Sequence, residues 1–220
     1  MTVKNATAVR LAEILQTKRL ENPIGNALLE SAARGDLRMD ALQRLVGTEA
    51  QAHRAELAAY GTMLARYPEH PAADLFIQLA QLVYAAQPKL RECAKALGMS
   101  DAHSSRWPAE RATYSFNGTL SWLAVQGSQA ACALASYTDM KVYFSGCTQF
   151  AQRVRTDGID VPPEFLAYYD DEGSEELRQL ALDVVQNGLD RGDDEADAVF
   201  CARLLEESIG EFWQSAAGTI

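Results

Sequence analysis

Three ionisable side chains interrupt an apolar helical stripe between residues 37 and 66. Glu49, His53 and Glu56 follow one another at steps of four and three residues, and the same steps lead on to Tyr60. An α-helix repeats every 3.6 residues, so these side chains share one face with the leucines around them. Burying an unpaired charge costs several kcal/mol, so a helix with this face inward needs partners, a ligand or water there. A polar pocket in a helical core would supply them, whereas a shifted stripe would leave the three groups at its wet edge.

Two further carboxylates repeat this pattern on other segments. Asp139 lies on an apolar face four residues before Tyr143, and Glu206 lies on another, three residues before Ile209. Carboxylates that share a dry site raise one another's pKa, so one can act as general acid while another acts as base. The sequence therefore predicts that Glu49, Asp139 and Glu206 line one cavity as catalytic residues.

Helices are the elements that would position these groups, since no period-two run is long enough for a strand. Helix start and stop signals recur along the chain and predict an all-α fold. We expect Asn22 to cap the first helix, with Pro23 in its first turn. The predicted helices cover about residues 22–35, 37–66, 71–98, 111–126, 129–155, 162–190 (with a break near 170–173) and 194–217. The segment 129–155 has two apolar stripes and is expected to be the central helix.

Composition and charge exclude several classes of protein. The 220 residues contain no Pro/Gly/Ser-rich linker, so one domain over residues 1–220 is expected. Thirty acidic and twenty basic residues give a net charge of −10, with no basic stripe that could follow phosphates, so no nucleic-acid partner is expected. No apolar run reaches the roughly 20 residues of a membrane span. The opening MTVKNATAVR lacks the apolar middle of a signal peptide, which indicates a cytoplasmic protein with no membrane partner.

The four cysteines are spread along the chain without a CxxC pair: Cys93, Cys132, Cys147 and Cys201. This spacing is not typical of a zinc site, and a disulfide framework is not expected in a cytoplasmic protein. We expect them to be small buried apolar groups.

Four segments resemble a known family. In chain order they are NPIGNALLESAARGDLRMDALQRLV, RECAKALGMS, ATYSFNGTL and EFWQSAA. Their order resembles the TenA (thiaminase II) and PqqC group of the haem-oxygenase-like fold, over nearly the whole chain. The resemblance implies a bundle of about seven helices around a central small-molecule pocket. It also implies a homo-oligomer, a dimer or a tetramer.

The catalytic residues of that family match this chain only in part. TenA enzymes that cleave aminopyrimidines use a cysteine on the central helix, and the position that lines up is Asp139. Cys132 lies two turns earlier. The family's acid on the second helix falls near Gly47, two residues before Glu49. Its glutamate near the C-terminus falls at Ile209, one turn after Glu206.

The aromatic residues match better. Tyr114, Tyr143 and Tyr169 line up with tyrosines of the family, and one pocket tyrosine appears as Phe116. Tyr143 and Trp213 are equally compatible with an ordinary aromatic core. The full set expected to bind substrate is His53, Tyr114, Phe116, Tyr143, Tyr169 and Trp213.

The supply of histidines separates the other chemistries of this fold. Haem oxygenases bind haem through a histidine of the first helix, and the first histidine here is His53. Di-iron oxidases need histidines on the third and last helices, which have none; His70 and His103 lie in predicted turns. No metal or cofactor is therefore expected, although Glu49, His53, Asp139 and Glu206 leave a metal site geometrically open.

The functional hypothesis is a TenA-like enzyme that hydrolyses an aminopyrimidine or a related heteroaromatic amine, with pocket carboxylates in place of the cysteine. An alternative is a non-catalytic small-molecule-binding or regulatory protein on the same scaffold. Two others remain open, a metal-dependent oxidase of this fold and a specialised biosynthetic enzyme with an unrelated substrate. All four hypotheses require the same internal pocket.

Overall fold

The computed structural model describes residues 6–100 and 110–218, and within these ranges the chain forms nine helices and no strand. The all-α prediction is confirmed, with two helices more than the seven expected. The helices are α1 (Ala6–Glu21), α2 (Ala27–Arg34), α3 (Met39–Arg66), α4 (Ala72–Ala96), α6 (Thr113–Gln126), α7 (Gln129–Thr156), α8 (Pro163–Tyr169), α9 (Glu175–Asp190) and α10 (Glu195–Ala217). None of them combines the length and apolar character that a membrane span needs.

The helix boundaries follow local capping chemistry. Ser128, Ser174 and Asp194 each accept a hydrogen bond from the backbone N–H three residues later, at the starts of α7, α9 and α10. Gly35 ends α2 in the left-handed conformation, with φ of 74°. These starts and stops agree with the prediction from sequence.

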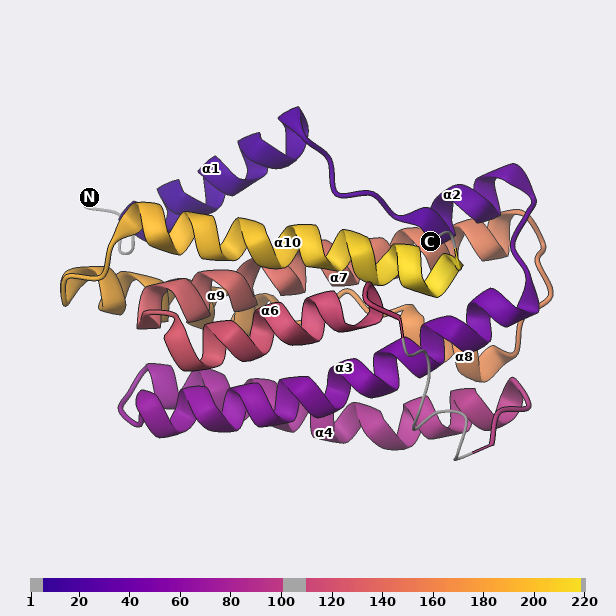
Figure 1. Ribbon diagram of the computed structural model, residues 1–220, viewed down its shortest axis with the longest axis horizontal. Coiled ribbons are helices and arrows are strands. Elements are labelled where there is room, and N and C mark those ends of the chain that lie inside the picture. The colour runs from indigo at the N-terminus through magenta and orange to yellow at the C-terminus, as the bar shows by residue number, and fades with distance from the viewer. Residues whose placement is uncertain (1–5, 101–109, 219–220) are drawn as a thin grey trace.

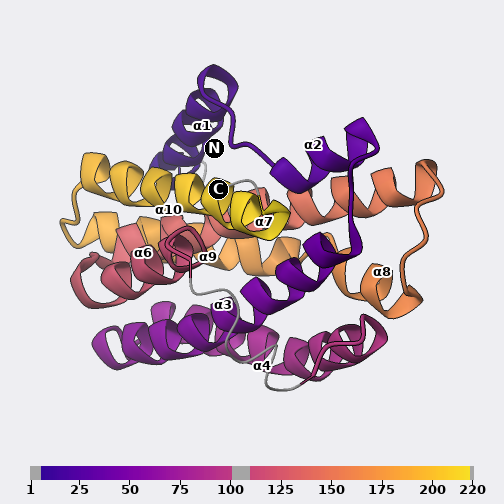
Figure 2. The ribbon, with the colours of Figure 1, turned by 45° about the vertical axis from the view of Figure 1, so that its right-hand side comes forward.

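One predicted cap was wrong. Asn26, not Asn22, caps α2, because its side-chain oxygen accepts from the Leu29 N–H at 3.0 Å. Pro23 therefore lies in the connector between α1 and α2, which Figure 2 shows as a thin non-helical segment. The sequence analysis also assigned no helix to residues 6–21, although the buried residues Ala8, Leu11 and Leu15 have helical spacing.

The long helices run side by side along the molecule (Figure 1). α3 packs between α4 and α6, and α7 packs between α9 and α10. Seven consecutive residues of α7, 130–136, are at most 2% exposed, so the prediction of a central helix here is confirmed. Four of the seven are alanines, whose small side chains let neighbouring helices approach closely.

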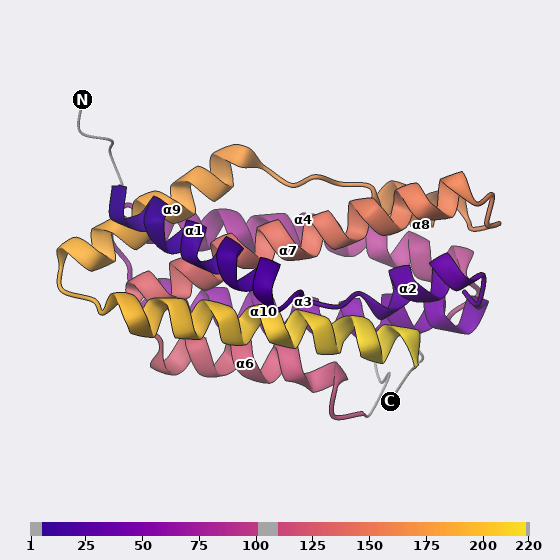
Figure 3. The same cartoon turned by 90° about the horizontal axis from the view of Figure 1, so that it is seen from above.

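A buried ionic cluster attaches α1 to the core. Glu206 of α10 is fully buried, and its carboxylate accepts hydrogen bonds from Arg19 of α1 and Thr138 of α7. Arg203, one turn earlier on α10, adds a further bond at 3.1 Å. Figure 3 shows the result, with α1 lying across α10, α9 and α7. The two arginines and the hydroxyl compensate the cost of burying this carboxylate.

We predict that Glu206→Gln lowers the free energy of unfolding by about 3–5 kcal/mol, because two guanidinium groups would lose their buried counter-ion. Urea unfolding would measure this. The matched control is Glu207→Gln, since Glu207 also pairs with Arg203, at 3.0 Å, but is 58% exposed. The control should change stability by less than about 1 kcal/mol. Equal effects of the two changes would contradict the anchoring role.

Candidate functional site

A cavity of about 180 Å³ lies between α3, α4, α7, α8 and the segment after α8. A smaller space of about 30 Å³ adjoins it and reaches α6 and α10. Four side chains line both spaces: Glu49, Glu56, Asp139 and Tyr143. We call the two spaces together the carboxylate cavity. Glu49, His53, Glu56 and Tyr60 all line it, so the inward orientation of the α3 stripe is confirmed.

The three carboxylates line the same space, and among the described residues only Glu49 forms an ion pair with a basic side chain, that of His53. Glu49 is 5% exposed, while Glu56 and Asp139 are half-buried because they line the hollow. Among the described residues, no hydrogen bond or ion pair joins Glu56 or Asp139 to another side chain. Burial, and then the charge of Glu49, raises the pKa of Asp139 to about 7. Burial also raises the pKa of Glu56 well above its ordinary value, with added repulsion from Asp139 and Glu49.

A histidine and a tyrosine complete a hydrogen-bonded set with Glu49. The Tyr168 hydroxyl lies 2.9 Å from His53 Nε2 and 3.3 Å from Glu49 Oε1. His53 Nε2 is in turn 3.4 Å from the same carboxylate oxygen. Because Tyr168 belongs to α8, these contacts join two helices at the cavity wall. His53 Nδ1 and Glu49 Oε2 take no part in these contacts.

Four buried polar atoms at this cavity lack an oxygen or nitrogen partner within the described part of the chain: Glu49 Oε2, His53 Nδ1, Tyr143 OH and Tyr169 OH. Buried polar groups in proteins are almost always hydrogen-bonded. Burial is the main reason that the pKa of each tyrosine at the cavity is raised, so their hydroxyls stay protonated and can donate at neutral pH. The site therefore has polar groups suited to a bound molecule or to water.

All four cysteines are buried, as predicted from the sequence, and one of them reaches the cavity. Cys132, the cysteine nearest to the family position in the sequence, does not line the cavity, and its Sγ lies 3.3 Å from the Leu123 carbonyl. Cys147 does line it, two turns after Asp139 on the same face of α7. Burial and the charge of Glu49 raise the pKa of the Cys147 thiol well above its ordinary value, which makes it a weak nucleophile.

Some predicted site residues lie elsewhere. Glu206 does not line the cavity with Glu49 and Asp139, so this part of the prediction was wrong. Its carboxylate lies on the other side of α7, where it forms an ion pair with Arg19. Tyr114 is 48% exposed on the outer face of α6, so the expectation of a pocket position was wrong.

The remaining aromatic residues lie at or behind the cavity wall. Phe116 lines the smaller space, and Tyr143 and Tyr169 line the larger. Trp213 does not reach the cavity but stacks on Tyr143, with ring centroids 5.8 Å apart and planes inclined by 11°. The substrate roles of these residues stay a prediction.

Several lining residues were not among the predicted site residues. Glu56 and Tyr60 were visible on the α3 stripe, and Cys147 follows Asp139 by eight residues, so periodicity could have selected them. No sequence signal marks Tyr168, because the turn after α7 brings it beside His53 only in the folded chain.

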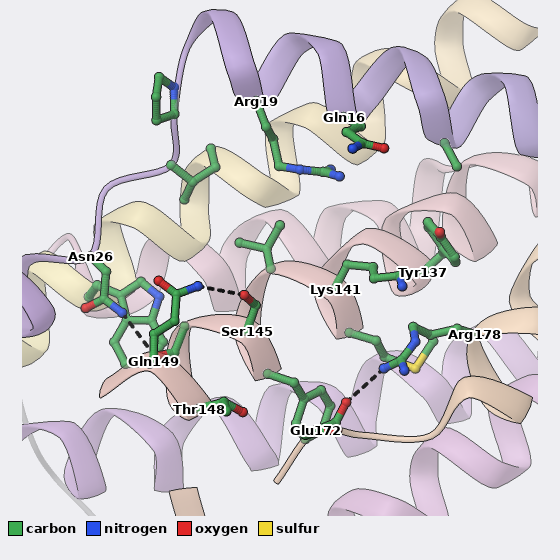
Figure 4. Close-up of a pocket in the computed structure, with 18 of the residues that line it drawn as sticks. Gln16, Arg19, Asn26, Tyr137, Lys141, Ser145, Thr148, Gln149, Glu172 and Arg178 are labelled. Carbon is green, nitrogen blue, oxygen red and sulfur yellow. Dashed lines mark hydrogen bonds between the residues drawn. The ribbon is translucent and has the colours of Figure 1, made fainter. Parts of the chain in front are cut away.

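A second, larger hollow is an open groove of about 1020 Å³ between α1, α2 and α7. Figure 4 shows its polar rim, with Arg178 bonded to the Glu172 backbone at 2.9 Å. Its basic side chains already have acidic partners. Arg178 lies 2.8 Å from Glu175, and Lys141 lies 3.8 Å from the same carboxylate. Arg19 pairs with Glu206. None of the partnerless buried atoms in the described chain lies in it. The carboxylate cavity, not this groove, is the candidate site.

Within the described ranges, no group of three His, Cys, Asp or Glu residues has the geometry to hold a metal ion. His70 is exposed beside Asp74, and His103 lies outside the described residues.

Comparison with solved structures places this arrangement among known folds. A TenA homologue from Pyrococcus furiosus superposes with a TM-score of 0.70 and 15% identity, over 94% of this chain and 99% of that one. A TenA homologue from Pseudomonas syringae pv. tomato gives 0.69 and 8%, over 96% and 90%. No family model and no curated protein matches the sequence.

The fold is thus the haem-oxygenase-like helical bundle, as predicted from the sequence. Within that class, the resemblance to the TenA proteins is confirmed for the fold. The likeness to PqqC and the oligomeric state stay predictions.

The raised pKa of Asp139 predicts a pH-dependent stability. In the unfolded chain Asp139 ionises near 3.8, and in the folded protein near 7. The folded state holds more protons between these values, so ionisation favours unfolding as pH rises from about 4 to 7. The free energy of unfolding of Asp139→Asn should therefore rise relative to that of the wild type by about 2–4 kcal/mol as the pH increases across this window. Above about pH 7 the difference between the two proteins should stay constant.

Urea unfolding of both proteins between about pH 5 and pH 8 measures this difference. The exposed carboxylate of Glu69 supplies the control, because water solvates it in both states. Glu69→Gln should follow the wild type at every pH. A constant difference between Asp139→Asn and the wild type over the whole range would contradict the raised pKa.

Proposed function

We propose that the protein is a small-molecule hydrolase that acts on a single-ring heteroaromatic amine, such as an aminopyrimidine, in the carboxylate cavity. The main support is one cavity that is lined by three carboxylates and by the residues of four buried polar atoms that have no oxygen or nitrogen partner in the described chain. A folded protein tolerates such groups when a ligand or water satisfies them. Their mixture of donors and acceptors suits a ring with an exocyclic amine.

The size of the cavity limits the substrate. A cavity of roughly 150 Å³ in another protein holds one benzene ring. The main space here is about 180 Å³, so it admits one ring with a short substituent. Larger ring systems would have to leave a part outside, past Leu82 and Lys89 at the exposed edge of α4.

Acid–base chemistry is the reaction that these residues can support. With a pKa of about 7, Asp139 gains and loses a proton near neutral pH. In the proposed step, water adds to the carbon that bears the amine, and Glu49 accepts the proton of that water. Asp139 gives its proton to the departing nitrogen, so the C–N bond breaks and the amine leaves. Tyr168 and His53 hold the Glu49 carboxylate in place.

The same geometry explains how the reaction could proceed without a cysteine nucleophile. Asp139 occupies the position that the TenA resemblance gives to that cysteine, and the thiol of Cys147 is held protonated by burial. A general acid at this position activates the leaving group directly. The alternative of a non-catalytic binding protein uses the same cavity and is separated from the enzyme by the following test.

We predict that Asp139→Asn lowers the rate of amine release by about 10²–10⁴-fold, because the general acid is lost while the shape is kept. The assay would offer a panel of single-ring heteroaromatic amines and detect released ammonia or amine. Ligand affinity, measured by calorimetry with the same compounds, should change by less than about tenfold.

Glu69→Gln, an exposed carboxylate change on the connector after α3, serves as the activity control and should retain the wild-type rate. Equal rates for Asp139→Asn and the wild type would remove Asp139 from the mechanism. Binding of a panel member without turnover by the wild type would favour the binding protein instead.

A further inference from the structure

The charge of the carboxylate cavity is unbalanced. Among the described residues, the titratable side chains that line it belong to four helices and one connector: Glu49, His53, Glu56 and Tyr60 on α3, Lys89 on α4, Asp139, Tyr143 and Cys147 on α7, Tyr168 and Tyr169 on α8, and Asp171 on the segment after α8. The residues of α6 and α10 at the smaller space are apolar. Lys89 is exposed at the rim, where solvent screens it.

Even a protonated His53 would compensate only one of the three inner carboxylates. His53 lies beside Glu49, at 3.4 Å, and leaves Glu56 and Asp139 without a counter-ion. The contrast with Glu206 is direct, because that carboxylate is buried with two arginines. In the cavity, burial instead raises the pKa of both carboxyl groups, so each holds a proton to a higher pH than a solvated carboxyl group does.

Aromatic rings form much of the rest of the wall. Tyr143 contacts Phe144 edge to face, with centroids 5.6 Å apart, and Tyr168 contacts Tyr169 in the same manner at 4.7 Å. Tyr60 adds a further ring from α3. Aromatic faces attract organic cations, most strongly where water is excluded. Carboxylates and aromatic faces together form the usual chemistry of a site for an ammonium or a ring cation.

We propose that the carboxylate cavity selects an organic cation, a protonated or N-alkylated single-ring amine, over a neutral molecule of the same shape. This inference rests on the proposed function, since it names the charge of the ligand at that same site. Below about pH 7 the cation takes the place of the proton on Asp139, and binding releases that proton. A neutral ligand gains nothing from the charge of either carboxylate.

The proposal has a defined pH dependence. Below the pKa of Asp139, about 7, the entering cation must displace a proton, so its affinity rises with pH up to that value. Above about pH 7 Asp139 is already ionised, so it contributes no further rise in the affinity for the cation. A neutral ligand has no such dependence.

The experiment uses two probes of the same shape, N-methylpyridinium and toluene, titrated into the full-length protein by calorimetry. At about pH 8 we expect the cation to bind at least about tenfold more tightly than toluene. Its affinity should fall as the pH is lowered to about 6. Titrations at about pH 6 in buffers of different ionisation enthalpy should show proton release with the cation and none with toluene.

Glu56→Gln and Asp139→Asn should each reduce the preference for the cation, while toluene binding stays within about twofold and shows that the variants are folded. Glu69→Gln is the matched control and should keep the wild-type preference. Equal binding of the two probes, binding of neither, or an unchanged preference in both cavity variants would overturn the inference. If the wild type hydrolyses a neutral amine but does not prefer the cation, the proposed function stands and the inference fails. If it binds the cation selectively but hydrolyses no panel member, the inference stands and the proposed function fails.

Discussion

Carboxylates inside a helical core impose the constraint on which this structure depends. α3 turns Glu49, His53 and Glu56 inward together with its leucines, and a charge in that place needs a partner, water or a proton. The neighbouring helices therefore close around a hollow instead of filling it. The raised pKa values of Asp139 and Glu56 are the electrostatic consequence, because the site holds protons where other cores hold counter-ions.

Glu206 shows the other solution to the same constraint. In the sequence it is indistinguishable from Asp139, since both are acids on apolar helical faces. In the structure Glu206 meets Arg19 from a helix 187 residues away along the chain and becomes part of an anchor. Within the part of the chain that the structure describes, Asp139 pairs with no basic side chain and remains available to a ligand. A buried acid alone therefore does not indicate a catalytic residue. Whether a basic side chain neutralises the acid separates a structural role from a candidate catalytic one.

The parts of the structure that were predictable from sequence are the parts set by local chemistry. Helical periodicity and caps such as Ser128, Ser174 and Gly35 depend on residues within one turn, and they gave correct boundaries. The rotation of a helix about its axis was harder to predict. Tyr114, Trp122 and Val125 are all exposed on α6, so the apolar residues of this helix do not mark its buried face. Contacts over long sequence distances, such as that of Tyr168 with His53, have no local signal at all.

α7 shows how the cavity and the anchor depend on one another. Thr138 and Asp139 are neighbours in sequence, and successive residues of a helix point about 100° apart, so one reaches Glu206 while the other reaches the cavity. One turn later, Tyr143 lines the cavity and stacks its ring on Trp213 of α10. The rotation of α7 is thus fixed by a polar contact and a ring contact that both involve α10, and neither contact involves the Asp139 carboxylate. Asp139 is oriented by its helix without being neutralised by a partner, which is the condition that a preorganised acid must meet.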